Sequence, residues 1–152
     1  MKKVDVGQAT AILANIGVIA GIFFLGFELR QTRYSLQDNT HLQSVALISE
    51  NSHLLFDSDF ADTYGAALEE WSNLSDVQEQ QVTTYVAERI NVWEYTYYAY
   101  QRGTMDPELW EGWDSYFTSE INQSTWQIIW SEIEIGYGNT FRGHVNAIID
   151  EG

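Results

Sequence analysis

Two groups of side chains in this 152-residue sequence have residue types and spacings that could carry chemistry. In the first, Glu50 and His53 are three residues apart, so a helix would place a carboxylate and an imidazole on one face, as in helical-bundle metal sites. Such a site also needs a second Glu-x-x-His and two more glutamates on facing helices, and the sequence contains no second Glu-x-x-His. We therefore predict no metal site and no cofactor.

The second group combines one cation with several aromatic rings. Arg89 lies four residues before Trp93, on a helix face that should be buried, and a buried guanidinium needs a carboxylate partner or a ring to stack on. One interpretation is a structural ion pair with Glu50, Glu94 or Asp114. The other is a small-ligand receptor or enzyme, with the candidate pocket residues Arg89, Trp93, Tyr97, Trp110 and Trp113.

Familiar catalytic motifs do not accompany these residues. The sequence has no Gly-x-Ser-x-Gly elbow and no glycine-rich loop that would cradle phosphate. It also has no cysteine, which excludes disulfides, thiol catalysis and zinc-thiolate sites. We therefore predict no catalytic residue and favour a binding module over an enzyme.

The charge of the chain is strongly negative and unevenly distributed. The formal net charge is −15, and twenty of the 22 acidic residues follow Tyr34, because only Asp5 and Glu28 precede it. The basic residues beyond that point are Arg89, Arg102 and Arg142. Such a surface repels nucleic acid and anionic lipid headgroups, so we predict no nucleic-acid partner.

One apolar stretch, Ala9 to Phe27, dominates the N-terminal part of the sequence. It contains no charge, and as a helix at about 1.5 Å per residue it would be about 28 Å long, close to the ~30 Å hydrocarbon thickness of a bilayer. A cleaved signal peptide would have a shorter apolar core and a small-x-small site beyond it, and a buried core helix would carry a polar face. The stretch therefore predicts a transmembrane anchor, with the lipid bilayer as its partner.

This anchor divides the chain into a short leader at 1–8, a transmembrane helix at 9–28 and an acidic helical domain at 29–152. Lys2 and Lys3 lie on one side of the anchor, and Arg30 and Arg33 on the other. Because basic flanks favour the cytoplasmic side, the two ends compete and the charges do not set the orientation.

Small residues cluster on the predicted anchor. Gly17 and Gly21 form a Gly-x-x-x-Gly pair, with Ala14 and Asn15 one turn before them. Small residues let membrane helices approach closely, and an amide can hydrogen-bond across the contact. We therefore predict a helix–helix interface here, with a second copy of the chain or with another membrane protein.

Apolar residues recur at three and four throughout the rest of the chain, which predicts an all-α domain. The predicted helices span 9–56, 60–71 (capped by Ser58 or Asp59), 75–102 (with a Ser75–Gln78 capping box), 107–120, 124–135 and 139 onward. The long first helix thus packs with about four or five shorter ones. Its leucine stripe, Leu29, Leu36, Leu47 and Leu54, should be covered by the later helices or by a neighbouring copy.

Two segments resemble a protein family. NIGVIAGIFFLGFELRQTRYSLQ and, further on, YYAYQRGTMDPELWEGW with a Trp-rich tail are similar to uncharacterised small bacterial proteins that carry one N-terminal membrane helix and an aromatic-rich helical domain. The resemblance implies a bacterial inner (cytoplasmic) membrane location, with the arginine-bearing exit and the domain on the cytoplasmic side. It implies no activity, cofactor or catalytic residue.

Overall fold

The computed structural model describes residues 6–152, and within this range the chain is all-α with no β-strand. The α-helices are α1 (Val6–Ser52), α2 (Ser58–Glu69), α3 (Asp76–Gln101), α4 (Pro107–Ile121), α5 (Ser124–Ile133) and α6 (Asn139–Glu151). Short 3₁₀ helices connect some of them: η1 (His53–Phe56), η2 (Trp71–Asn73) and η3 (Glu134–Gly136). The predicted fold class, a long N-terminal helix that packs with shorter helices, is confirmed.

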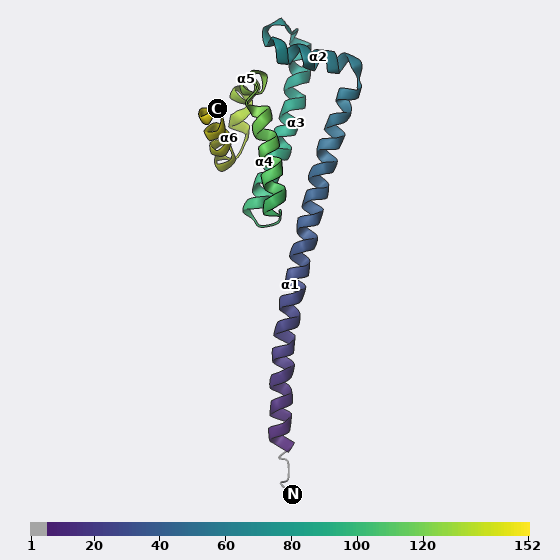
Figure 1. The fold of residues 1–152 in the computed structure, drawn as a ribbon, viewed down its shortest axis with the longest axis vertical. Coiled ribbons are helices and arrows are strands. Elements are labelled where there is room, and N and C mark those ends of the chain that lie inside the picture. The colour runs from purple at the N-terminus through teal and green to yellow at the C-terminus, as the bar shows by residue number, and fades with distance from the viewer. Residues whose placement is uncertain (1–5) are drawn as a thin grey trace. The chain divides into compact units, whose positions relative to one another are not determined.

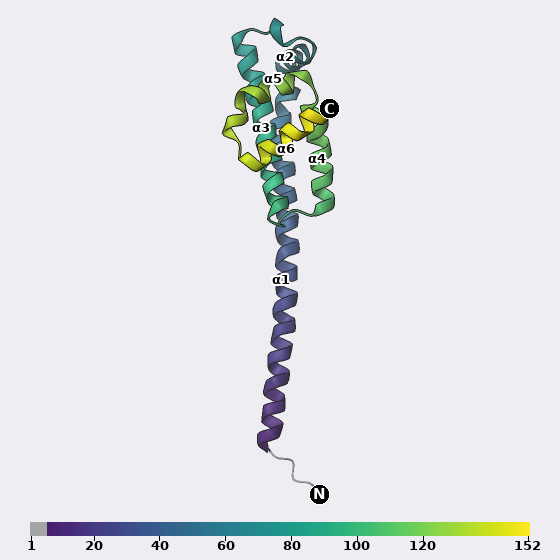
Figure 2. The ribbon, with the colours of Figure 1, turned by 90° about the vertical axis from the view of Figure 1, so that its left-hand side faces the viewer.

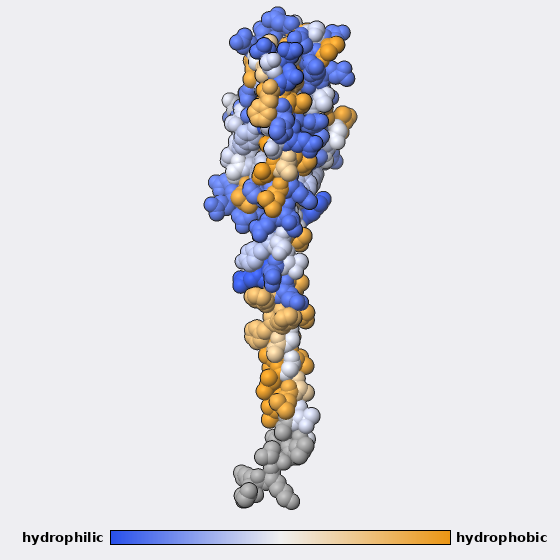
Figure 3. Space-filling view, turned by 90° about the vertical axis from the view of Figure 1, so that its right-hand side faces the viewer, coloured by the Kyte–Doolittle hydropathy of each residue, from blue (hydrophilic) through white to orange (hydrophobic). Residues whose placement is uncertain are grey.

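The chain divides into two units, Met1–Leu36 and Gln37–Gly152. The described part of the first unit is helical, and every side chain from Thr10 to Leu36 is exposed. This is the one helix among the described residues that is long and apolar enough to cross a membrane. Figure 3 shows apolar side chains, in orange, gathered on the part of this helix next to the grey residues. The Lys2-Lys3 leader lies outside the described residues.

Helix α1 ends earlier than the sequence predicted. It stops at Ser52, and the next four residues tighten into the 3₁₀ helix η1 instead of continuing the α-helix to Phe56. The predicted cap is also wrong, because Asp57 caps α2 in place of Ser58 or Asp59. The Asp57 carboxylate accepts the Asp59 N–H at 2.9 Å and the Phe60 N–H at 3.2 Å. These hydrogen bonds satisfy two backbone amides that have no partner within the helix, and so stabilise the start of α2.

Helix α3 begins and ends where local sequence signals predict. The Ser75 N–H donates to Gln78 Oε1 at 3.0 Å, which is one half of a capping box. At the other end Gly103 has a φ of 73°, a conformation that costs glycine no Cβ clash. Thr104 N–H then bonds to Ala99 O and Gly103 N–H to Tyr100 O, both at 2.9 Å, which completes a Schellman motif.

The starts of the last three helices follow from short polar segments. Asp106 accepts the Glu108 N–H at 2.9 Å, with Pro107 at the first helical position of α4. Ser124 was predicted to cap α5, but it is the first residue of that helix and Gln123 precedes it as the cap. Gly138 precedes α6, whose first residue is Asn139.

The core of the second unit lies between α3, α4, α5 and α6. Helices α3 and α4 pack side by side, and α6 lies across them, as Figures 1 and 2 show from two directions. The largest fully buried side chains are Trp93, Trp126, Phe117, Phe141 and Ile90. Rings that each bury about 150–250 Å² supply much of the apolar surface that a domain of this size needs.

The part of α1 that belongs to the second unit buries polar side chains. Gln37, Thr40, Ser44 and Asn51 are buried, and we call these four residues the polar seam. Gln37 Nε2 donates to Gly103 O at 3.4 Å, and Asn51 Nδ2 donates to Glu88 Oε2 at 2.6 Å. The seam therefore joins α1 to the other helices through side-chain hydrogen bonds.

The predicted leucine stripe is not the face that α1 buries. Leu29, Leu36, Leu47 and Leu54 are all exposed, and the later helices leave Leu47 and Leu54 at 46% and 45% exposure. The seam residues are spaced by three, four and seven, so they form their own helical stripe beside the leucines. The expectation that the later helices cover the stripe is thus wrong for Leu47 and Leu54, and cover by a neighbouring copy stays a prediction.

Candidate functional site

Arg89 is buried on α3 and is held by aromatic rings. Its side chain is 4% exposed, and Cζ lies 5.3 Å from the ring centroid of Tyr85 and 5.4 Å from that of Tyr116. Nη1 donates to Ser52 Oγ at 3.4 Å, whereas Nε has no hydrogen-bond partner in the described part of the chain. Two cation–π contacts thus stabilise the buried guanidinium in place of the predicted carboxylate.

The predicted ion pair of Arg89 is wrong. Glu94 is committed elsewhere, because its Oε1 accepts the Gly138 N–H at 2.8 Å. Asp114 accepts hydrogen bonds from other side chains, and Glu50 lines a groove between α1 and α3. Within residues 6–152 the contact between an acidic and a basic side chain is the one between Asp114 Oδ1 and His144 Nε2, at 2.8 Å.

The charge of Arg89 lowers the pKa values of Glu120, Tyr85 and Tyr64, in each case against the larger effect of burial. Burial raises the pKa of the Glu120 carboxyl, and the Arg89 charge and a hydrogen bond from Gln123 partly offset that rise. Burial likewise raises the pKa of Tyr85, against the effect of the same arginine. The field of Arg89 is therefore shared by several groups instead of being neutralised by one.

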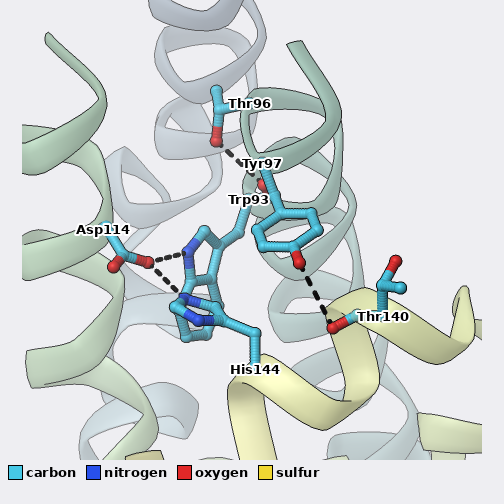
Figure 4. A network of polar contacts seen from close by, with 6 residues as sticks. All are labelled: Trp93, Thr96, Tyr97, Asp114, Thr140 and His144. Carbon is cyan, nitrogen blue, oxygen red and sulfur yellow. Dashed lines mark hydrogen bonds and ion pairs between the residues drawn. The ribbon is translucent and has the colours of Figure 1, made fainter. Parts of the chain in front are cut away.

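Asp114 on α4 joins two other helices through one carboxylate oxygen (Figure 4). Its Oδ1 accepts from Trp93 Nε1 of α3 at 2.9 Å and lies 2.8 Å from His144 Nε2 of α6. An ionised carboxylate has no proton to donate, so Nε2 is the protonated nitrogen of His144. A carboxylate that orients an imidazole is an element of hydrolytic triads, but no hydroxyl in the described chain bonds to His144.

Three aromatic rings of α3 and α4 lie around His144. The His144 ring centroid lies 5.2 Å from that of Tyr97, 5.8 Å from Trp93 and 6.0 Å from Trp110. Trp110 also stacks on Tyr100 at 5.3 Å with an interplanar angle of 9°. Three of the five candidate pocket residues are thus gathered around one histidine.

Trp113, the remaining candidate pocket residue, points toward α1. Its Nε1 donates to His41 Nδ1 at 3.4 Å, and its ring stacks on Phe117 at 6.0 Å. It lines a shallow hollow of about 400 Å³ with His41 and Tyr116. The structure therefore separates the five residues into three environments, at Arg89, at His144 and at Trp113.

The candidate helix–helix interface lies on an open surface. Ala14, Asn15, Gly17 and Gly21 are all exposed. A Cβ added at Gly17 or Gly21 would meet no atom within 4 Å outside its own helix. Another helix can therefore approach this face closely, and the interface itself stays a prediction.

Glu50 and His53 lie at the end of α1 with different neighbours. Glu50 lines the groove between α1 and α3, whereas His53 lies in η1 and meets the ring of Phe56 edge-on at 5.3 Å. In the described part of the chain, no three His, Asp or Glu side chains are grouped so that they could hold a metal ion.

Sequence reasoning missed two features that the structure brings out. His144 lies three residues after Phe141 and one before Val145, so its place on the inward side of α6 was visible in the pattern. Its partner Asp114 was proposed for Arg89 instead. The spacing of the polar seam was also visible in the sequence. The leucines were predicted to form the buried face of α1 because leucine is the usual residue of a buried stripe.

Comparison with protein-family models, with curated proteins and with solved structures finds no match to this chain.

Proposed function

We propose that this chain is a single-pass protein of the bacterial cytoplasmic membrane whose acidic domain, residues 29–152, is a binding, scaffolding or regulatory module. The observation that carries the proposal is the apolar helix from Thr10 to Phe27, every side chain of which is exposed. An exposed helix of about twenty apolar residues is stable in lipid and unstable in water. The family resemblance supports the same location and a cytoplasmic domain.

The proposed module works within an oligomer or a complex with another membrane protein. Open small residues on the anchor and exposed leucines beyond it are surfaces that a partner would bury. The Asp114–His144 pair, by contrast, is partly buried and packs against the core rings of Trp93 and Trp110, which fits a structural role for it.

Membrane fractionation tests the anchor. We expect the chain to stay in the membrane pellet after alkaline extraction and to enter solution with detergent. Ile19→Lys combined with Phe23→Asp should release it, since each charge at the centre of a membrane helix costs about 2.5–3.5 kcal/mol on insertion scales. Recovery of the unaltered chain in solution, folded and without detergent, would refute the proposal.

Crosslinking in native membranes tests the complex. We expect a crosslinked species larger than the monomer, and Gly17→Leu with Gly21→Leu should weaken it if the small residues form the contact. Monomer alone at every crosslinker concentration would count against a scaffolding role. Protease protection in sealed inside-out vesicles would test the cytoplasmic side, where we expect the domain to be cleaved.

A second candidate function, a small-ligand receptor or enzyme near Arg89, is favoured by one observation. Nε of this buried arginine has no hydrogen-bond partner in the described chain, and an anionic ligand could supply one. A thermal-shift screen with small carboxylates and phosphates tests it. A ligand that raises the Tm of the natural chain and not that of Arg89→Met would support this function over the first.

A further inference from the structure

An open groove of about 600 Å³ runs between α1 and α3 in the second unit. One wall presents Leu47 of α1 and Leu54 of the following 3₁₀ helix η1, and the α3 wall presents Val92 and Tyr95. Glu88 and Tyr95 are seven residues apart on α3, so the groove follows α3 for about two turns, and its other side is formed by the last turns of α1 and by η1. This is the shape that receives an amphipathic helix.

Two carboxylates lie beside the apolar residues of the groove. Glu50 on α1 and Glu88 on α3 line the same groove, and both side chains are exposed. Neither forms an ion pair with a Lys or Arg of the described chain. The groove therefore combines apolar contact area with negative charge that the protein itself does not neutralise.

Asn51 adds a third observation at the base of the groove. Its side chain is 7% exposed, and Nδ2 donates to Glu88 Oε2 at 2.6 Å. Its Oδ1 has no hydrogen-bond partner in the described chain. A buried acceptor left in this state costs free energy, so a donor brought between α1 and α3 would be stabilising there.

We propose that this groove binds a basic amphipathic helix of a partner protein. The leucines of such a helix would pack on Leu47, Leu54 and Val92, and its Lys or Arg residues would pair with Glu50 and Glu88. A second copy of this chain is a poor occupant, because its own domain is acidic and would be repelled. This inference rests on the proposed function as a binding module and names the chemistry of the partner.

Peptide binding to the full-length chain in neutral detergent micelles tests the groove. The probe is a fluorescent Lys/Leu peptide about four helical turns long, with leucines at three- and four-residue spacing, measured by anisotropy against protein-free micelles. We expect saturable binding that weakens with salt. An acidic Glu/Leu peptide of the same pattern, and a Lys/Leu peptide of the same composition in scrambled order, should bind at least about tenfold more weakly.

Paired variants separate the groove from the overall charge. Glu50→Gln with Glu88→Gln should weaken the Lys/Leu peptide roughly tenfold, because it removes two charge pairs worth about 0.5–1 kcal/mol each. The charge-matched control, Glu111→Gln with Glu132→Gln, changes two exposed carboxylates outside the groove and should weaken binding less than about twofold. Leu47→Asn with Leu54→Asn should also weaken binding while leaving the Tm within a few degrees, since neither leucine is in the core.

Several outcomes would overturn the inference. These are no binding, equal weakening by the groove and control variants, or equal binding of the scrambled peptide. Failure of the proposed function is a different result, because it would appear as loss of membrane retention or of crosslinked species. A chain that crosslinks to a partner equally well with and without the groove variants would keep the function and refute the groove.

Discussion

Helix α3 meets two unlike surfaces. Toward α4, α5 and α6 it presents fully buried apolar side chains such as Ile90 and Trp93, whereas α1 offers amides and hydroxyls beside the partly buried Ile48. A buried apolar side chain contributes about 1.5–3 kcal/mol, and a net hydrogen bond about 0.5–1.5 kcal/mol. We infer that the stability of the domain resides mainly in the core around α3, α4, α5 and α6, while the polar seam mainly determines which face of α1 is turned inward.

Among the predictions, Phe117→Ala in the core should lower the stability of the domain most. Phe117 is fully buried and stacks on Trp93 at 5.4 Å, so the truncation leaves a cavity. We expect the free energy of unfolding to fall by about 3–5 kcal/mol, measured by urea unfolding of the full chain in micelles. If that variant does not fold, Phe117→Leu should fold and lose about 1 kcal/mol.

Phe56→Ala is the matched control for this substitution. Phe56 is the same residue type at 80% exposure, so its loss should change the free energy of unfolding by less than about 0.5 kcal/mol. Similar losses at the two positions would show that the core assignment is mistaken.

Alkaline pH provides a second way to weaken the core side. Burial, with the Glu94 charge as a smaller cause, raises the pKa of Tyr137 from 10.0 to about 12. Between these values the unfolded chain gives up the phenol proton while the folded chain keeps it, so stability falls as the pH rises. We expect this residue to remove about 2 kcal/mol between pH 10 and pH 12.

Tyr137→Phe isolates that contribution. The variant loses a long hydrogen bond, from the Tyr137 hydroxyl to Ala87 O at 3.3 Å, so its stability at pH 8 should be within about 1 kcal/mol of the natural chain. Its unfolding free energy should then fall less steeply above pH 10. Parallel curves for the two proteins would mean that the phenol titrates alike in both states.

Asp106→Ala removes the N-cap of α4 and should lower the stability of the domain by a smaller amount. The Asp106 carboxylate caps α4 through the Glu108 N–H, and loss of an N-cap costs about 1 kcal/mol. Asp106→Asn keeps an acceptor at the same place and should retain most of that stability. Thermal unfolding by circular dichroism would measure both, and an equal drop in Tm for the two variants would point away from capping.

The sequence predicts the ends of several helices well, because these depend on local chemistry. The Ser75 and Asp106 starts and the Gly103 stop depend on residues within one turn, so local chemistry was enough to find them. Asp57 was missed because its neighbours Ser58 and Asp59 are equally good capping types, and only the backbone distinguishes them.

The contacts of the candidate site depend instead on which helices face one another. Asp114 pairs with His144 because α4 and α6 are neighbours, and Arg89 lies between rings because Tyr116 of α4 faces Tyr85 of α3. Hydrophobic periodicity predicts the inward face of each helix but does not predict which helices lie next to it. The sequence therefore predicts which residues are buried better than it predicts their partners.

The seam side of the comparison is tested by Ser44→Ala, for which we expect the smallest effect. Ser44 is fully buried, but its hydroxyl donates to Thr40 O of the same helix at 2.9 Å, so no group on α3 loses a partner. Alanine also favours the helix by up to about 0.5 kcal/mol, which offsets the lost bond. The free energy of unfolding should change by less than about 0.5 kcal/mol, although a fully buried position in an apolar core would be among the most sensitive. A loss above about 2 kcal/mol would show that the seam holds the domain together and that α3 does not have two unequal sides.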